Sequence, residues 1–123
     1  ATYNFAADGG AVATITPAVN VTIPQNFVIQ NVALNSTTAV TSGGSATVSV
    51  GLSAGGGGAA ALVAATAKAS WSANAFVQGV PVPQTASTWI KMSAAGSVTV
   101  TVATAALTAG VIEVYIFGYQ SAS

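Results

Sequence analysis

The chain has 123 residues, a length that suits a single domain with one modest core. Hydrophobic residues make up 52% of the sequence and aromatic residues only 7%, so the core must be built from small side chains, mainly Ala and Val. Charged residues make up only 3%, two Lys and two acidic residues with neither Arg nor His, against about 25% in ordinary soluble domains.

This charge count excludes several kinds of partner and site. Two lysines cannot neutralise a phosphate backbone, so we expect no nucleic-acid partner. Because Cys is absent, neither a disulfide framework nor a thiolate metal site can form. A chain with so few charges and zero net charge lacks the repulsion that keeps monomers dispersed, and we therefore expect it to function inside a permanent assembly.

No stretch of the sequence is typical of a membrane or export segment. The longest uninterrupted apolar run, residues 59–65, is far shorter than the roughly 20 residues of a membrane-spanning helix. The beginning of the sequence has neither a cationic stretch nor an apolar one, so we expect no secretory signal. We also expect no membrane partner.

The first part of the chain predicts a series of short strands separated by turn residues. Asp8 with the two following glycines predicts a hairpin-type turn, and Pro24 ends a run in which apolar and polar residues alternate. Apolar residues on both faces of the next run indicate a central strand or a strand at a subunit interface. The expected strands lie at residues 3–6, 11–16, 19–23 and 27–34, followed by a turn at 35–38.

Residues 41–52 carry the clearest strand signal. Gly43 and Gly44 supply the positive φ angles of a turn, after which apolar residues occupy every second position from Ala46 to Leu52. Small hydroxylated residues and glycine fill the positions between them. We therefore expect a strand with one apolar and one hydroxylated face.

The second half contains a loop, an Ala-rich segment and further strands. Four glycines at 55–58 predict a passive loop, and alanine in residues 59–69 favours a short helix or turn. Pro81 and Pro83 remove donors from a ladder, so their segment must be extended or looped. The expected strands lie at residues 71–76, 89–93, 97–103 and 111–119, with a turn at 107–110.

Turn signals separate strands that are spaced by about eight to twelve residues, which is typical of sandwiches, jelly rolls and barrels. We see no internal repeat of fixed period. The sequence therefore predicts an all-β fold: a single-domain antiparallel β-sandwich over residues 1–123, jelly-roll-like, with at most one short helix.

The glycine-rich stretch matches the outline of a dinucleotide-binding fingerprint, with Gly56, Gly58 and Ala61 as G-x-G-x-x-A. That fingerprint also needs an acidic residue about 20 positions further on, and the acids of this chain are Asp8 and Glu113. The strand before the glycines alternates, whereas a parallel Rossmann strand is apolar on both faces. We therefore expect no cofactor site.

The sequence contains few residues of the types that act in catalysis. Asp8 is best interpreted as a turn residue, and Glu113 as a strand carboxylate that pairs with a lysine or faces solvent. Without His and Cys, only Lys68 or Lys91 could activate a serine or threonine nucleophile. Two carboxylates offer at most a weak Ca²⁺ site. We expect no catalytic residues, no metal site and no enzymatic activity.

The large aromatic side chains are either core anchors or subunit contacts. In the last strand, Ile112, Val114 and Ile116 share one face, which should fill the core. The opposite face of this strand carries several aromatic side chains, so we expect it to be covered rather than exposed to solvent. The candidate subunit contacts are Trp71, Phe76, Trp89, Tyr115, Phe117 and Tyr119.

The order of segments along the chain supports a family resemblance. It comprises an initial DGG at 8–10, Ile23-Pro24, the long strand after TSGGSAT at 41–47, LVAATA at 62–67, and AALTAG at 105–110 before an aromatic terminal strand. In this order the chain resembles small virion proteins of tailed bacteriophages, of the kind that decorate or cement the capsid. The resemblance implies a jelly-roll-like fold, homotrimers on the capsid surface in contact with the major capsid protein, assembly in the host cytoplasm, and no enzymatic activity.

Three functions are therefore compared. The first is a capsid decoration or cement subunit that adds buried area across joints of the shell. The alternative is a fibre or spike domain that binds a host receptor or glycan, which the low aromatic content of the loops disfavours. The third is a filament subunit completed by strand exchange, which would normally need a longer free N-terminal segment.

Overall fold

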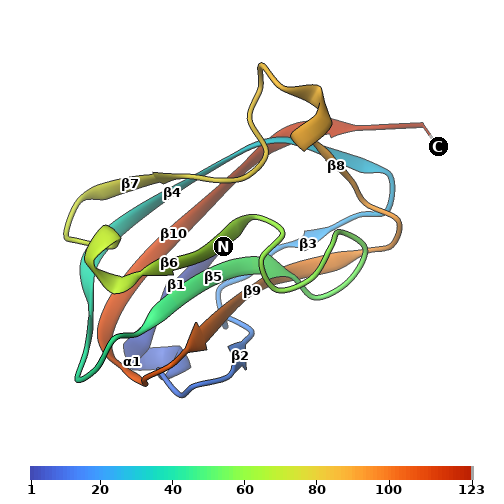
Figure 1. The fold of residues 1–123 in the computed structure, drawn as a ribbon. Coiled ribbons are helices and arrows are strands. Elements are labelled where there is room, and N and C mark those ends of the chain that lie inside the picture. The colour runs from blue at the N-terminus through green and yellow to red at the C-terminus, as the bar shows by residue number, and fades with distance from the viewer. Residues whose placement is uncertain (123) are drawn as a thin grey trace.

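The computed structural model describes residues 1–122, which form two five-stranded antiparallel sheets facing each other (Figure 1). The first, called sheet 1, contains β1 (Thr2–Asn4), β10 (Leu107–Gln120), β4 (Phe27–Ser42), β7 (Ala75–Gln78) and β8 (Ile90–Lys91). The second, called sheet 2, contains β2 (Thr14–Ile15), β3 (Thr22–Ile23), β9 (Gly96–Ala103), β5 (Thr47–Leu52) and β6 (Val63–Ala67). The short helices are α1 (Phe5–Asp8), η1 (Lys68–Ser70) and η2 (Ala86–Thr88). The predicted all-β sandwich is confirmed.

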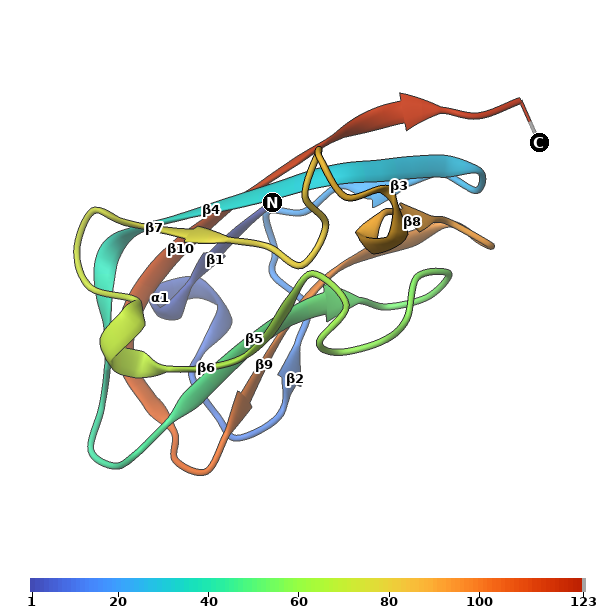
Figure 2. The ribbon, with the colours of Figure 1, turned by 45° about the horizontal axis from the view of Figure 1, so that its top comes forward.

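The strand order is that of a jelly roll. In sheet 1 the order is β1-β10-β4-β7, and β8 pairs with β4 beyond the end of β7. In sheet 2 the order is β2-β9-β5-β6, and β3 pairs with the other end of β9. Taken as interrupted strands, β2 with β3 and β7 with β8 complete two four-membered sheets between which the chain crosses repeatedly. The two layers are separate in Figure 2.

Side-chain amides bridge both interruptions. Between β2 and β3, Asn20 Nδ2 donates to the carbonyl oxygen of Val98 at 2.8 Å, and its Oδ1 accepts from the Val98 N–H at 3.1 Å. Next to β7, Gln78 Nε2 donates to the carbonyl oxygens of Val32, at 3.1 Å, and Pro81, at 3.4 Å. Asn20 thus pairs both backbone groups of Val98, which a continuous strand would pair, whereas Gln78 adds a second donor to the Val32 carbonyl beside the Gly79 N–H.

The core lies between the sheets and consists mostly of Val, Leu and Ile, with Trp71, Tyr3 and Met92 among the larger buried side chains; alanine, which composition predicted beside valine, contributes only Ala46. In β10, Ile112 and Val114 are buried, as the alternation predicted. The valines that fill the facing side come from β5 and β9: Val48, Val50, Val98, Val100 and Val102.

The second face of β5 carries the predicted small and hydroxylated residues, and it is largely covered. Ser49 and Gly51 on that face are also buried. Because β5 lies between β9 and β6, its edges are covered, and residues 58–59 fold directly over Gly51. A side chain at Gly51 would overlap the backbone of Gly58. The glycine therefore allows the loop to lie against the strand.

Two predicted turns are wrong. Instead of turning at residues 35–38, β4 continues to Ser42, because Ser36 is buried with its Oγ donating to the carbonyl oxygen of Trp71 at 3.0 Å. Instead of turning at 107–110, the chain turns before β10, where Thr104 has a φ of 76°. Gly110, with a φ of 146°, lies in an irregular part of the β10 ladder.

The expectation of a short helix or turn at 59–69 is met only at the ends of this segment: residues 59–60 form a turn and η1 begins at Lys68, but Val63–Ala67 forms β6 along β5. A short isolated helix is marginal in water, whereas a strand here buries Leu62 and Val63 against the core. The expected strand at 3–6 is replaced from Phe5 by α1, which Asn4 caps by accepting from the Ala6 N–H at 3.0 Å.

The remaining strand predictions hold in part. The strand at 97–103 is confirmed as β9. Three predicted strands are shorter in the structure: 11–16 is reduced to β2, 19–23 to β3 and 89–93 to β8. The strand predicted at 71–76 is shifted towards the C-terminus and forms β7.

The first two residues of the predicted passive loop, Gly55 and Gly56, pack against neighbouring segments, whereas Gly57 and Gly58 are exposed. Gly55 has a φ of 79°, and a Cβ there would overlap the carbonyl oxygen of Ala94. The carbonyl oxygen of Gly55 also accepts from the Ser93 N–H at 2.9 Å, so the loop is joined to the segment before β9. Gly56 lies against Leu52 and Met92.

We expect Gly55→Ala to lower the free energy of unfolding by about 1–3 kcal/mol, because it combines an unfavourable φ with a steric overlap. Gly43→Ala is the matched control, since a Cβ at Gly43 meets open space and, contrary to the sequence prediction, neither Gly43 nor Gly44 has a positive φ. Urea unfolding of both variants tests this. Equal stability of the two variants would show that the loop is passive.

We expect Tyr3 to make the stability of the fold depend on alkaline pH. Its side chain is fully buried and its hydroxyl donates to the carbonyl oxygen of Gly9 at 2.6 Å. Burial, together with the negative charge of Asp8, raises the pKa of Tyr3 to about 12 from its usual value of 10.0. The unfolded chain therefore loses this proton at lower pH than the folded chain does.

The contribution of Tyr3 should be complete below about pH 10 and should be lost as the pH rises towards about 12. Unfolding in urea at about pH 9 and about pH 11.5 measures this loss. We expect Tyr3→Phe to lose less stability over that interval than the wild type. An identical loss in both proteins would contradict the role of Tyr3.

Candidate interaction surface

The outer face of sheet 1 carries the exposed aromatic side chains of the chain's strands. Residues that pair across an antiparallel ladder point to the same face, so the register gives the rows of this surface. We call it the aromatic face. Its rows are Thr2, Glu113, Asn35 and Phe76, then Tyr115, Ala33 and Gln78, then Phe117 and Asn31.

The aromatic side chains on these strands are open to solvent. Phe76 on β7 is 81% exposed, and on β10 Tyr115 is 47%, Phe117 52% and Tyr119 49% exposed. Ile112, on the opposite side of the same strand, is fully buried. The two faces of β10 therefore differ as the alternation predicted.

The two tryptophans occupy different places. Trp71 is fully buried in the core of its own chain, where it cannot reach a partner, and its Nε1 has no acceptor among the described residues. Trp89 is half-buried, and its Nε1 donates to the carbonyl oxygen of Val82 at 2.9 Å, closing the loop before β8. Trp71 is thus a core anchor, and the contact role of the other candidates stays a prediction.

Glu113 gives the aromatic face a single carboxylate. Asn35 Nδ2 donates to its Oε1 at 3.4 Å, while Asn35 Oδ1 is buried without a partner among the described residues. The negative charge of Glu113, followed by burial and a hydrogen bond to the same carboxylate, raises the pKa of Tyr115. The hydroxyl of Tyr115 therefore stays protonated and can donate at neutral pH.

The groups considered for catalysis make structural contacts. Asp8 Oδ2 accepts from the Asn4 N–H and Oδ1 from the Ala18 N–H, both at 2.9 Å. Lys68 Nζ donates to the carbonyl oxygen of Ser42 at 2.9 Å. The part of the chain that the structure describes holds no group of three or more His, Cys, Asp or Glu side chains suited to a metal ion.

The glycine loop leads into strand β6, so it lacks the helix N-terminus on which a dinucleotide pyrophosphate is bound. Among residues 1–122, no helix has the length and apolar character needed to cross a membrane.

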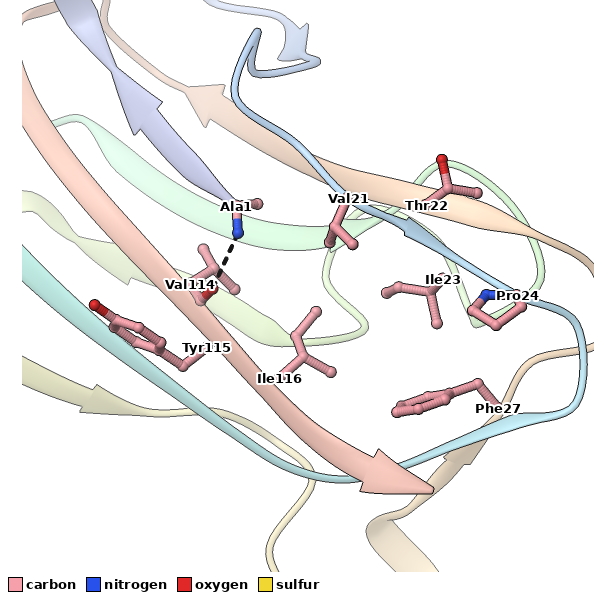
Figure 3. Close-up of a pocket in the computed structure, with 9 residues that line it drawn as sticks. All are labelled: Ala1, Val21, Thr22, Ile23, Pro24, Phe27, Val114, Tyr115 and Ile116. Atoms are coloured by element: carbon pink, nitrogen blue, oxygen red, sulfur yellow. Dashed lines mark hydrogen bonds between the residues drawn. The ribbon is translucent and has the colours of Figure 1, made fainter. Parts of the chain in front are cut away.

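A pocket of about 330 Å³ opens between β3 and β10 (Figure 3). Ile23 and Val114 on its wall are buried, Phe27 and Ile116 are partly buried, and Val21 is exposed. In Figure 3 the side chains of Val21, Ile23, Phe27 and Ile116 converge. The residues around the pocket are Ala1, Val21, Thr22, Ile23, Pro24, Phe27, Val114, Tyr115 and Ile116.

Sequence reasoning missed this pocket. The alternation of Val21 and Ile23 with polar residues was a strand signal, and nothing in it showed that the chain before Pro24 lies beside the last strand. The hint available in the sequence was a short apolar run that ends abruptly at Pro24.

No protein-family model matches the sequence, and the comparison with curated proteins gives no match. Among solved structures, the chain is similar to one described as "Capsid of Ralstonia phage GP4", with a TM-score of 0.60 and 19% sequence identity. The match covers 100% of this chain and 84% of that chain. At this identity, the similarity shows that the two chains share a fold.

Proposed function

We propose that the chain is a non-enzymatic structural protein of a phage virion, a capsid decoration or cement subunit. It acts as a homotrimer on the capsid surface, contacts the major capsid protein and assembles in the host cytoplasm. The observation that carries the proposal is the aromatic face: four large aromatic side chains stand exposed on the strands of a chain with almost no charge.

The area of these side chains suits a protein contact. With about 200 Å² for a fully exposed aromatic side chain, Phe76, Tyr115, Phe117 and Tyr119 together expose about 460 Å². One partner in a standard interface buries about 800 Å², so these residues supply more than half of that area. Tyr and Phe are also among the residues enriched in interfaces, whereas charged residues are depleted from interface centres.

The shared fold supports a virion role, because the similar solved structure is a phage capsid. A subunit that reinforces a shell needs neither a catalytic group nor a tight single site, since small gains from apolar burial add up over many copies. Asp8 and Lys68 are held in structural hydrogen bonds, which agrees with a non-enzymatic role.

The position of the aromatic residues also separates this proposal from a glycan-binding spike domain. Such a domain would present aromatic side chains from the loops at one end of a sandwich, as binding loops do on rigid scaffolds. Here the exposed aromatic side chains lie on strands β7 and β10, and the loop residue Trp89 is half-buried.

The two faces of β10 should respond differently to truncation. We expect Ile112→Ala to lower the free energy of unfolding by about 2–5 kcal/mol, because it removes buried atoms and leaves a cavity. Phe117→Ala should instead reduce binding to shells that lack the protein, with a smaller effect on the fold. Thermal melting and co-sedimentation with such shells measure the two effects. If Phe117→Ala destabilised the fold as much as Ile112→Ala and bound shells normally, the aromatic face would have no contact role.

A further inference from the structure

Phe76 is the most exposed large apolar side chain among the described residues, with 81% of its surface open. It lies on β7, at one end of the order of sheet 1, and its neighbour in the ladder is Asn35. No aromatic ring on the adjacent strand β4 covers it, since the outer-face residues of β4 are Asn31, Ala33 and Asn35. Because so much of its apolar surface is in contact with water, burial of Phe76 against a partner would be favourable.

The pocket between β3 and β10 has the size and chemistry to receive such a group. An apolar cavity of about 150 Å³ holds a benzene molecule, and this pocket measures about 330 Å³. Its wall consists mostly of apolar side chains, together with Thr22, Tyr115 and the N-terminal ammonium of Ala1, which donates to the carbonyl oxygen of Val114 at 3.2 Å. Strand β7, with the sequence AFVQ, carries no charge, so the inserted ring brings no ion of its own that must be desolvated on contact.

Phe76 and the pocket belong to opposite sides of one copy. In sheet 1, β4 pairs with β7 on one side and with β10 on the other. The pocket lies beyond β10, beside β3 of sheet 2. Phe76 therefore does not fill the pocket of its own chain, and a contact between the two must join separate copies. Two different surfaces in contact form a heterologous interface, which closes into a ring when the rotation between copies permits.

We propose that Phe76 of one copy fills the pocket between β3 and β10 of the next copy, so that three copies close into a ring. This inference rests on the homotrimer of the proposed function. Each copy then contributes one Phe76 and one pocket, and both are buried in the closed ring.

Two variants remove the two halves of the contact separately. Phe76→Ala removes the inserted ring, and Val21→Glu places a charge at the exposed rim of the pocket. Val12→Ala is the control, because Val12 is an exposed valine that belongs to neither surface. Thermal melting should show that all three variants keep the fold, because the substituted side chains are exposed.

Sedimentation velocity measures the outcome. We expect the wild type and Val12→Ala to be trimers at about ten micromolar, and we expect Phe76→Ala and Val21→Glu to need at least about tenfold higher concentration for assembly. An equimolar mixture of Phe76→Ala and Val21→Glu should form dimers that neither forms alone, because the first keeps its pocket and the second keeps its Phe76.

A monomeric wild type, a Phe76→Ala variant as trimeric as the wild type, or a mixture without dimers would overturn the inference. Binding to shells is measured separately. Wild-type protein that forms the ring but does not bind shells would contradict the proposed decoration role and leave the ring standing. Wild-type protein that binds shells without forming the ring would contradict the ring and leave the proposed decoration role standing.

Discussion

The long antiparallel pairing of β4 with β10 is the interaction on which the rest of the structure depends. It runs from Leu107 opposite Ser42 to Gln120 opposite Phe27. Strand β1 attaches to its β10 side, and β7 and β8 attach to its β4 side. The core is built mainly from Val, Leu and Ile rather than from the Ala and Val that composition predicted. The register of this ladder decides which residues share a face. The aromatic face follows from that register.

Strong local patterns were enough to predict part of this fold. The alternation in 97–103 and 111–119 identified β9 and β10 and assigned Ile112 and Phe117 to opposite faces. Where tertiary contacts opposed local preference, prediction failed. Polar residues suggested a turn at 35–38, yet a buried hydrogen bond of Ser36 keeps β4 continuous. Alanine suggested a short helix or turn at 59–69, yet most of this segment pairs with the edge of β5 as strand β6.

The candidate surfaces were predictable to different degrees. The exposed aromatic residues of β10 follow from the alternation of side chains along a strand. The core position of Trp71 does not follow from the sequence, because it depends on hydrogen bonds from Ser36 and Val40 that hold the Trp71 carbonyl oxygen against β4. The pocket was beyond sequence reasoning, because crossing between the sheets brings Val21 and Ile116 together from distant parts of the chain. The packing of Gly55 against Ala94 was hidden for the same reason.

The central claim is that the aromatic face of this nearly uncharged subunit is buried against another protein in the native particle. An image of the native particle by electron cryo-microscopy tests it most directly. The account predicts that the face formed by β10, β4 and β7 lies against the shell protein or a neighbouring copy. If that face, with Tyr115 and Phe117, pointed to solvent while loops made the contacts, the account would be contradicted.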